Sequence, residues 1–331
     1  MRAVVVPAYG GPEMLCVQDV PEPQPGPGEV SVAVRFAGVN YTDVRNRQGD
    51  GLGKPPFIPG VEVAGTVRAV GAGVTSLRPG QPVAAFTRGH GYAEVATASE
   101  AFTVPVTEEL GGRPESAAML ITVPLVLMLL RRVTRVRPEE TVLLHSAAGG
   151  VGTVAGQLAR RAGLRPLLGT AGDAGKAEYA LRHGFGAVFG YDDFDTQVLA
   201  ATGGRGVDVV LDPVGGDIRA RSFPLVAAFG RLVSYSNISA EPETAPGAEW
   251  LRARCIGYAG FSAGQLSGRD PAAMRPGLTE AVQLVGSGEI DPGVTGVYPL
   301  ERGRRAPGVR EPGRRGQAHP GGLLSSPRSP W

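Results

Sequence analysis

The sequence predicts an α/β protein with two domains, a β-rich N-terminal domain followed by a doubly wound parallel sheet. With 331 residues, the chain is long enough to form two separate cores. The first hundred residues contain short β-type runs separated by turns rich in glycine and proline. From about residue 114, helical segments alternate with short apolar runs, which is typical of strands in a parallel sheet.

The N-terminal part is expected to form a compact, barrel-like domain. Valines alternate with other residues from position 29 to 37, which predicts a strand with one buried face. Turns such as Pro59-Gly60 and Pro79-Gly80 separate this strand from others. The expected strands cover residues 2–6, 15–19, 29–37, 61–70, 83–86 and 92–96.

Residues 141–171 carry the most informative pattern of the second part. An apolar run at 142–144 predicts a buried strand, and the turn 147–152 consists of residues with small side chains, apart from Val151. A helical apolar period ends near Gly163, and a second apolar run follows at 166–168. A strand, small-residue turn, helix and strand in this order are typical of a dinucleotide site, in which a pyrophosphate lies at the helix N-terminus. A glycine-rich loop of another fold is the alternative, because alanine occupies the first glycine position of the turn.

Composition excludes several classes of protein. The net charge of +2 gives no electrostatic signature of nucleic-acid binding. We expect no signal peptide at the N-terminus, and the apolar run at 119–130 is too short to span a bilayer and contains Pro124. Cys16 and Cys255 are expected to be reduced and buried. These features predict a soluble cytoplasmic protein that binds neither nucleic acid nor membranes.

Several spaced motifs give the chain a resemblance to a known family. It resembles the zinc-free quinone oxidoreductase branch of the medium-chain dehydrogenase/reductase superfamily from Met1 to about Glu301. The resemblance implies a GroES-like β-barrel-type domain at 1–115, a Rossmann domain at 116–298 and a homodimer. The motifs are PGVEVAGTV at 59–67, VGAGV at 70–74, GYAE at 91–94, the turn at 147–152, VDVVLD at 207–212 with Gly215-Gly216, GRLVS at 230–234 and YPLE at 298–301.

The sequence predicts no metal site. In zinc-dependent relatives a cysteine lies near the position of Asn40 and a histidine precedes the position of Glu62, where this chain has Val61. Zinc requires three or four ligands of the Cys, His or carboxylate type, and the four histidines are isolated from one another and from cysteine.

NADPH is the expected cofactor. NAD sites usually end the second strand with an acidic residue, whereas this chain has Ala171 there, which leaves room for a 2′-phosphate. Asp173 is the competing observation, since it could bind a ribose hydroxyl or could instead cap the next helix. The resemblance implies that Lys176 and Tyr191 hold the 2′-phosphate, and that the segment 235–237 faces the nicotinamide. The predicted cofactor residues are Ala148, Gly149, Gly150, Val151, Gly152, Gly169, Thr170, Lys176, Tyr191, Tyr235, Ser236 and Asn237.

The predicted reaction is hydride transfer to a quinone or an α,β-unsaturated carbonyl. The resemblance places Asn40 in a substrate cleft, and Tyr41 beside it could donate a hydrogen bond to the developing oxygen charge, although a turn residue and a core aromatic are the structural alternatives. The family's usual residues are replaced at Leu125 and Pro213, and the usual tyrosine is missing from 49–53. A biosynthetic enoyl reductase and a cofactor-binding protein with little catalysis are therefore the alternatives.

The C-terminal segment 299–331 departs from the family, which continues with a helix and a last strand beginning Gly-Lys. From residue 302 the chain is rich in arginine, glycine and proline without an apolar period, which predicts disorder. A basic arm for an acidic partner is one alternative. A frameshift is another, because residues 303–322 can be back-translated so that a one-base shift reads AAERLAYASRAAAGKLILVV.

Overall fold

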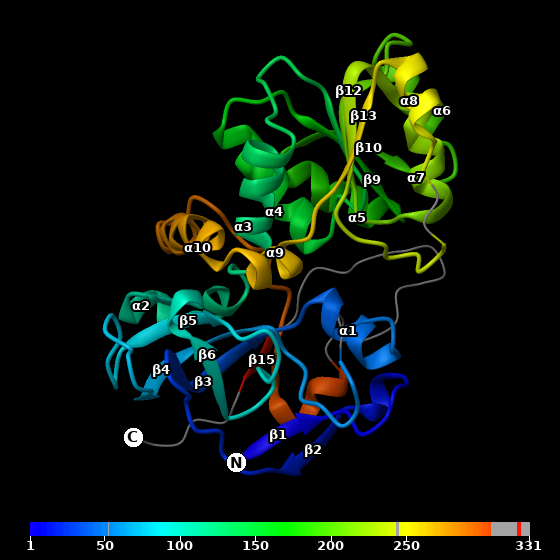
Figure 1. Cartoon of the computed structure of the whole chain (residues 1–331). Helices are drawn as coiled ribbons and strands as arrows, with labels where there is room; N and C mark the ends of the chain where they lie inside the picture. The colour runs from blue at the N-terminus through cyan, green and yellow to red at the C-terminus, as the bar shows by residue number, and fades with distance from the viewer. Residues whose placement is uncertain (52, 243–244, 306–322, 326–331) are drawn as a thin grey trace. The chain divides into compact units, whose positions relative to one another are not determined.

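The computed structural model describes residues 1–51, 53–242, 245–305 and 323–325, and these form two compact units (Figure 1). The first unit comprises the described residues up to Pro124 and those from Gly264 onward. The second unit comprises those from Leu125 to Ala263. The predicted α/β class is confirmed.

The first unit is built on a curled, mainly antiparallel sheet. Its described strands follow the order β14-β15-β3-β4-β5-β7, and β6 also pairs with β3. A separate antiparallel ribbon joins β1 to β2, which correspond to the strands expected at residues 2–6 and 15–19. The strands are β1 (Arg2–Val5), β2 (Cys16–Asp19), β3 (Glu29–Gly38), β4 (Glu62–Val70), β5 (Pro82–Phe86), β6 (Val95–Ser99), β7 (Thr103–Pro105), β14 (Val297–Pro299) and β15 (Leu323–Ser325).

Strand β3 lies at the centre of this unit. Val30, Val32 and Val34 are buried, which confirms the predicted buried face, and on the opposite face Ser31 is buried as well whereas Arg35 is exposed. Strand β3 pairs with β4 along one edge and with β6 along the other, so its backbone lies inside the sheet. Each fully buried valine contributes about 1.5–3 kcal/mol relative to an exposed one.

The second unit contains a parallel sheet with the strand order β10-β9-β8-β11-β12-β13. The order reverses direction between β8 and β11, which is the arrangement of a doubly wound nucleotide-binding sheet. Figure 1 shows α4 and α5 on one side of this sheet and α6, α7 and α8 on the other. The strands are β8 (Val142–Leu144), β9 (Leu167–Ala171), β10 (Phe185–Gly190), β11 (Val207–Asp212), β12 (Val226–Ser234) and β13 (Gly257–Gly260).

The described helices connect these strands. Helix α3 ends in a π-helical segment, Leu129–Val133. The α-helices are α1 (Tyr41–Gln48), α2 (Glu108–Gly111), α3 (Thr122–Met128), α4 (Gly150–Arg161), α5 (Ala174–Arg182), α6 (Phe194–Ala201), α7 (Gly216–Ser222), α8 (Ala248–Arg254), α9 (Ala263–Arg269) and α10 (Pro271–Gly286). Short 3-10 helices are η1 (Pro12–Met14), η2 (Glu100–Phe102), η3 (Pro114–Ala117), η5 (Phe223–Leu225) and η6 (Leu300–Arg305).

Helix α10 belongs to the first unit, whereas the sequence-based division placed residues 116–298 in one domain. The guanidinium of Arg275 on α10 donates hydrogen bonds to the carbonyls of Glu100, Ala101 and Thr103 at 2.9–3.2 Å. These contacts join α10 to η2 and to the start of β7, although the bonded residues are more than 170 positions apart in the sequence. A local sequence pattern carries no information about such pairing.

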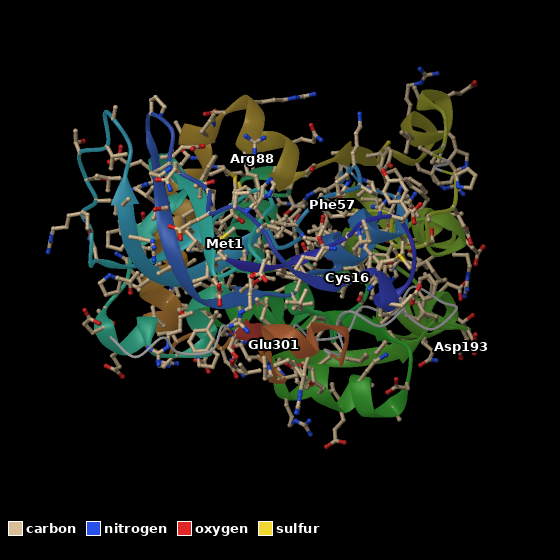
Figure 2. All side chains as sticks on the ribbon, turned by 90° about the horizontal axis from the view of Figure 1, so that it is seen from below. Met1, Cys16, Phe57, Arg88, Asp193 and Glu301 are labelled. Atoms are coloured by element: carbon tan, nitrogen blue, oxygen red, sulfur yellow. The ribbon has the colours of Figure 1, made fainter. Side chains whose placement is uncertain are left out.

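The described part of the C-terminal segment contains η6 and β15, and the rest of the segment predicted to be disordered lies outside the described residues. Strand β15 pairs antiparallel with β3 and parallel with β14. The carboxylate of Glu301, labelled in Figure 2, accepts from the Arg2 guanidinium, which also binds Glu94. The basic-arm and frameshift interpretations concern residues that lie mostly outside the described part of the chain, and both stay predictions.

The two cysteines differ from expectation in their burial. Both are free thiols, but Cys16 is half-buried and Cys255 is exposed. Cys255 follows the last residue of α8 with φ +54°, a left-handed position where the chain leaves the helix. The core of the second unit, to which Cys255 belongs, is formed by other residues, including Leu143, Phe194 and Leu232.

Candidate cofactor and active site

The turn after β8 forms as the sequence predicts. Gly149 is the N-cap of α4, whose first backbone N–H groups have no partners within the helix and carry its positive dipole end. A Cβ atom on Gly152 would lie 2.1 Å from the carbonyl oxygen of Ala147. Only glycine allows the helix to start this close to the turn. The predicted residues Ala148, Gly149, Gly150, Val151 and Gly152 therefore share one turn and helix start.

Alanine is tolerated in the first position of the turn because of a glycine on the neighbouring strand. Ala147 is fully buried, and its N–H donates to the Thr170 carbonyl at 2.9 Å. A Cβ atom on Gly169 would lie only 2.6 Å from the Ala147 Cβ. Gly169 and Thr170 thus lie directly beside the turn, and the missing Cβ of Gly169 makes room for Ala147.

Asp173 caps helix α5. Its carboxylate accepts a hydrogen bond from the Lys176 backbone N–H at 2.9 Å, and the Lys176 ammonium lies 3.5 Å from the other carboxylate oxygen. The N–H bond and the lysine charge hold the pKa of Asp173 below its ordinary value. Of the two interpretations of Asp173, the helix cap is confirmed. The last residue of β9 is Ala171, so this strand does not end with the acidic residue that is usual in NAD sites.

Tyr191 lies beneath the turn. Its hydroxyl accepts the N–H of Ser146 at 3.0 Å, and its ring is buried and stacks on His145. Burial raises the pKa of this hydroxyl above 10. Ser146 has φ +62°, a conformation that the Tyr191 contact stabilises. The described contact supports the turn, and the 2′-phosphate role of Tyr191 stays a prediction.

His145 is a core residue of the second unit. Its two ring nitrogens lie 2.9 Å from Thr170 Oγ1 and 2.8 Å from Ser222 Oγ. The ring is fully buried, and burial lowers its pKa from 6.5 to about 4. The neutral ring therefore connects β8 to β9 and α7.

We expect His145 to make the second unit acid-sensitive. Between pH 6.5 and 4 the His145 ring binds a proton in the unfolded chain but stays neutral in the native state. Its contribution to the free energy of unfolding therefore falls as the pH falls. The His145→Gln substitution should therefore lower the free energy of unfolding by about 2 kcal/mol less at pH 5 than at pH 7. Urea unfolding followed by Trp250 fluorescence in a Trp331→Phe background measures this difference. An equal destabilisation at both pH values would contradict it.

The loops after β11 and β12 meet at the same sheet edge as the turn. Asp212 is the last residue of β11, and its carboxylate accepts hydrogen bonds from the N–H groups of Val214 and Gly215. The segment of Tyr235, Ser236 and Asn237 follows β12 directly. Because the carboxyl ends of parallel strands lie at one edge, the structure brings this predicted segment to the edge that carries the turn.

In the first unit, Asn40 is part of a buried acidic network. Its side-chain amide donates to Glu62 Oε1 at 2.9 Å, and its backbone N–H donates to Asp43 Oδ2 at 2.9 Å. The other Glu62 oxygen accepts from the backbone N–H groups of Leu120 and Ile121. Burial raises the pKa of Glu62 to about 7, although these hydrogen bonds oppose the shift. Asn40 is thus held in one orientation.

Asp43 is the second acid of this network. Its carboxylate accepts from the Gly60 N–H at 3.0 Å and from the Tyr92 hydroxyl at 2.9 Å. Burial raises its pKa to about 6. Arg47, four residues further along α1, donates from its Nε to the Gly10 carbonyl at 3.1 Å. Because the native state binds protons on Asp43 and Glu62 more readily than the unfolded chain does, the contribution of these two acids to the free energy of unfolding rises as the pH falls below their raised pKa values. This pH dependence is opposite in sign to that of His145.

Tyr41, the other predicted catalytic residue, is the first residue of α1 and is half-buried. Burial raises its pKa. Sequence reasoning missed the partners of Asn40, although an acid in the apolar run of β4 is a signal that could have indicated Glu62. Among the described residues, no group of three or more His, Cys, Asp or Glu side chains is arranged to hold a metal ion.

Comparisons with known proteins agree with this geometry. Residues 26–120 match the alcohol dehydrogenase GroES-like domain, and residues 150–274 match the domain described as zinc-binding dehydrogenase. Quinone oxidoreductase of Rattus norvegicus is 32% identical over 315 residues, which cover 92% of each chain. The chain belongs to the quinone oxidoreductase branch of the medium-chain dehydrogenase/reductase superfamily.

Other members of the superfamily are similar over most of this chain. The synaptic vesicle membrane protein VAT-1 homolog of Rattus norvegicus is 32% identical over 91% of this chain and 79% of its own length. The crystal structure of Escherichia coli quinone oxidoreductase complexed with NADPH has a TM-score of 0.88 at 28% identity, covering 98% of this chain and 100% of that one. None of the helices in the described ranges has the length and hydrophobicity that crossing a membrane requires.

Proposed function

We propose that this protein is a zinc-independent oxidoreductase that transfers hydride from NADPH to a quinone or an α,β-unsaturated carbonyl. The observation that carries the proposal is the turn between β8 and α4, where the missing Cβ of Gly152 brings the helix start close to the backbone of Ala147. Backbone N–H groups at a helix N-terminus suit a pyrophosphate. The complex of the Escherichia coli relative with NADPH supports the choice of cofactor.

The residues at this sheet edge fit such a cofactor. The turn from Ala148 to Gly152 would hold the pyrophosphate, while Gly169 and Thr170 would lie near the adenosine ribose. The segment 235–237 would hold the nicotinamide, by resemblance to the family. When bound, NADPH supplies the hydride from C4 of its nicotinamide. The protein contributes binding, orientation and hydrogen bonds to the acceptor oxygen.

Lys176 is the proposed partner of the 2′-phosphate. It is half-buried at the start of α5, and no acid occupies position 171 to repel a phosphate or bind a 2′-hydroxyl. We expect Lys176→Ala to weaken NADPH binding about tenfold and to leave NADH binding unchanged. Cofactor fluorescence titration measures both. The matched control is Lys54→Ala, which removes the only other lysine of the chain. Equal losses for NADPH and NADH would contradict the role.

Asn40 and Tyr41 are the proposed contacts to the acceptor oxygen. An asparagine amide nitrogen has two N–H donors, and one of them is directed to Glu62. We propose that the other N–H donates to the oxygen on which charge develops. Because Glu62 also binds the backbone of residues 120 and 121, the amide is fixed before the acceptor arrives.

A titration followed by a turnover assay tests this function. Purified protein is titrated with NADPH and NADH, and 1,4-benzoquinone or an enone is then added while cofactor absorbance is followed. We expect tighter binding of NADPH and its oxidation by at least one acceptor. Turnover of enoyl thioesters alone would favour the enoyl reductase alternative, and binding without turnover over the panel would favour a cofactor-binding protein. Failure to bind NADPH would refute the proposal.

A further inference from the structure

The second unit contains a buried ion pair that the proposed chemistry does not use. Asp212 ends β11 and is fully buried, while Arg219 on α7 has only 1% of its surface exposed. The Arg219 Nε lies 2.6 Å from Asp212 Oδ2. Burying two charges is costly unless the geometry is good and the remaining hydrogen-bonding groups find partners. An apolar pair of similar size could fill this space, so the retained charges need another explanation.

Arg219 connects the ion pair to the predicted nicotinamide segment. Its Nη2 atom donates to the carbonyl oxygen of Ser236 at 2.8 Å. Asp212 meanwhile accepts from the N–H groups of Val214 and Gly215 in the turn after β11. The guanidinium is planar and rigid, so one side chain fixes a carboxylate and a carbonyl at a set angle. Lysine, with a single ammonium group, cannot reproduce that arrangement.

The same two loops approach each other closely. Gly215 has φ +82°, and a Cβ atom on it would lie 2.1 Å from Asn237 Oδ1. The Tyr235 N–H donates to the Asp212 carbonyl at 3.1 Å, and the Ile238 N–H donates to the Pro213 carbonyl at 2.9 Å. The turn after β11 therefore serves as the platform on which the segment 235–237 lies.

We propose that Arg219 is a positioning residue that fixes the peptide between Ser236 and Asn237 for the nicotinamide carboxamide of the cofactor. This rests on the proposed function. In a trans peptide the carbonyl and the following N–H point in opposite directions, so holding the Ser236 carbonyl also fixes the direction of the Asn237 N–H. An amide N–H in a set direction suits a carboxamide oxygen.

The test separates the nicotinamide end of the cofactor from its phosphate end. Arg219→Lys keeps the charge beside Asp212 but loses the planar contact to Ser236. We expect its dissociation constant for NADPH to rise about tenfold, since the Asn237 N–H loses its set direction and with it the hydrogen bond to the carboxamide oxygen. The dissociation constant for 2′,5′-ADP, which lacks the nicotinamide, should not change. Isothermal titration calorimetry measures both.

Arg231→Lys is the matched control. Arg231 lies on strand β12, which leads into the segment 235–237. It pairs with Glu140 at 2.6 Å and donates to the Thr134 carbonyl, so it also joins a carboxylate to a backbone carbonyl. This variant should lose thermal stability without changing NADPH affinity. If Arg219→Lys fails to fold, the double variant Asp212→Asn/Arg219→Met removes both charges and should show the same tenfold effect.

Two outcomes overturn the inference. One is an unchanged NADPH affinity in a folded Arg219 variant. The other is an equal loss for NADPH and 2′,5′-ADP, which would indicate a general structural role. Both differ from failure of the proposed function, in which wild-type protein itself would bind no NADPH.

Discussion

Replacing Gly152 with valine should weaken NADPH binding by at least about 100-fold, because two or more hydrogen bonds to the charged phosphates, each worth about 1.5–3 kcal/mol, lose their geometry. The new Cβ would lie 2.1 Å from the Ala147 carbonyl oxygen and 2.5 Å from its carbon. These are backbone atoms, which cannot move aside as a flexible side chain does. The start of α4 must therefore shift away from the turn. Fluorescence titration with NADPH measures the loss.

Gly286→Ala provides the control for a glycine in a helix. This residue ends α10, and a Cβ there would lie 3.5 Å from a Leu110 methyl group, an ordinary contact. NADPH affinity should be unchanged in this variant. Circular dichroism establishes that Gly152→Val is folded before its affinity is compared. A folded Gly152→Val protein with wild-type affinity would exclude the turn as the pyrophosphate site.

Replacing Asn40 with alanine should lower kcat about 100-fold, the effect of removing one donor to a developing oxygen charge. NADPH affinity should be unchanged, because Asn40 belongs to the first unit and the dinucleotide turn to the second. Steady-state kinetics with a quinone or enone, combined with cofactor titration, separates the two quantities.

The control for this variant is Asn46→Ala on the same helix. Asn46 accepts a hydrogen bond from the Gly53 N–H at 3.3 Å, so it serves the loop after α1. Its replacement should reduce stability slightly and leave kcat near the wild-type value. If Asn40→Ala retains full kcat, Asn40 does not contact the acceptor, and its contact with Glu62 is structural only.

The parts of the fold that the sequence predicted are those with local signals. The strand, turn and helix from residue 142 to 161 follow from apolar period and small residues within one short stretch. The helix cap at Asp173 follows from its position immediately before α5. Each of these features depends on residues only a few positions apart, where backbone preference and side-chain size decide the structure.

The parts that could not be predicted depend on contacts between distant residues. Asn40 and Glu62 are 22 residues apart, and Arg219 reaches Ser236 over 17 residues. Gly169 makes room for Ala147 only once β8 and β9 are paired. Strand β15 pairs with β3 across most of the chain, a pairing that composition does not indicate. Such pairings depend on tertiary packing, which overrides local propensity.

Transfer of a deuterium label tests the central claim most directly. The protein is incubated with NADPH deuterated at C4 of the nicotinamide in each of its two stereochemical forms, together with an enone acceptor, and the product is analysed by mass spectrometry. We expect one of the two forms to give a saturated ketone that carries one deuterium on carbon. A ketone formed without label from either form, or no product from either NADPH or NADH over a range of enones and quinones, would contradict hydride transfer by this protein.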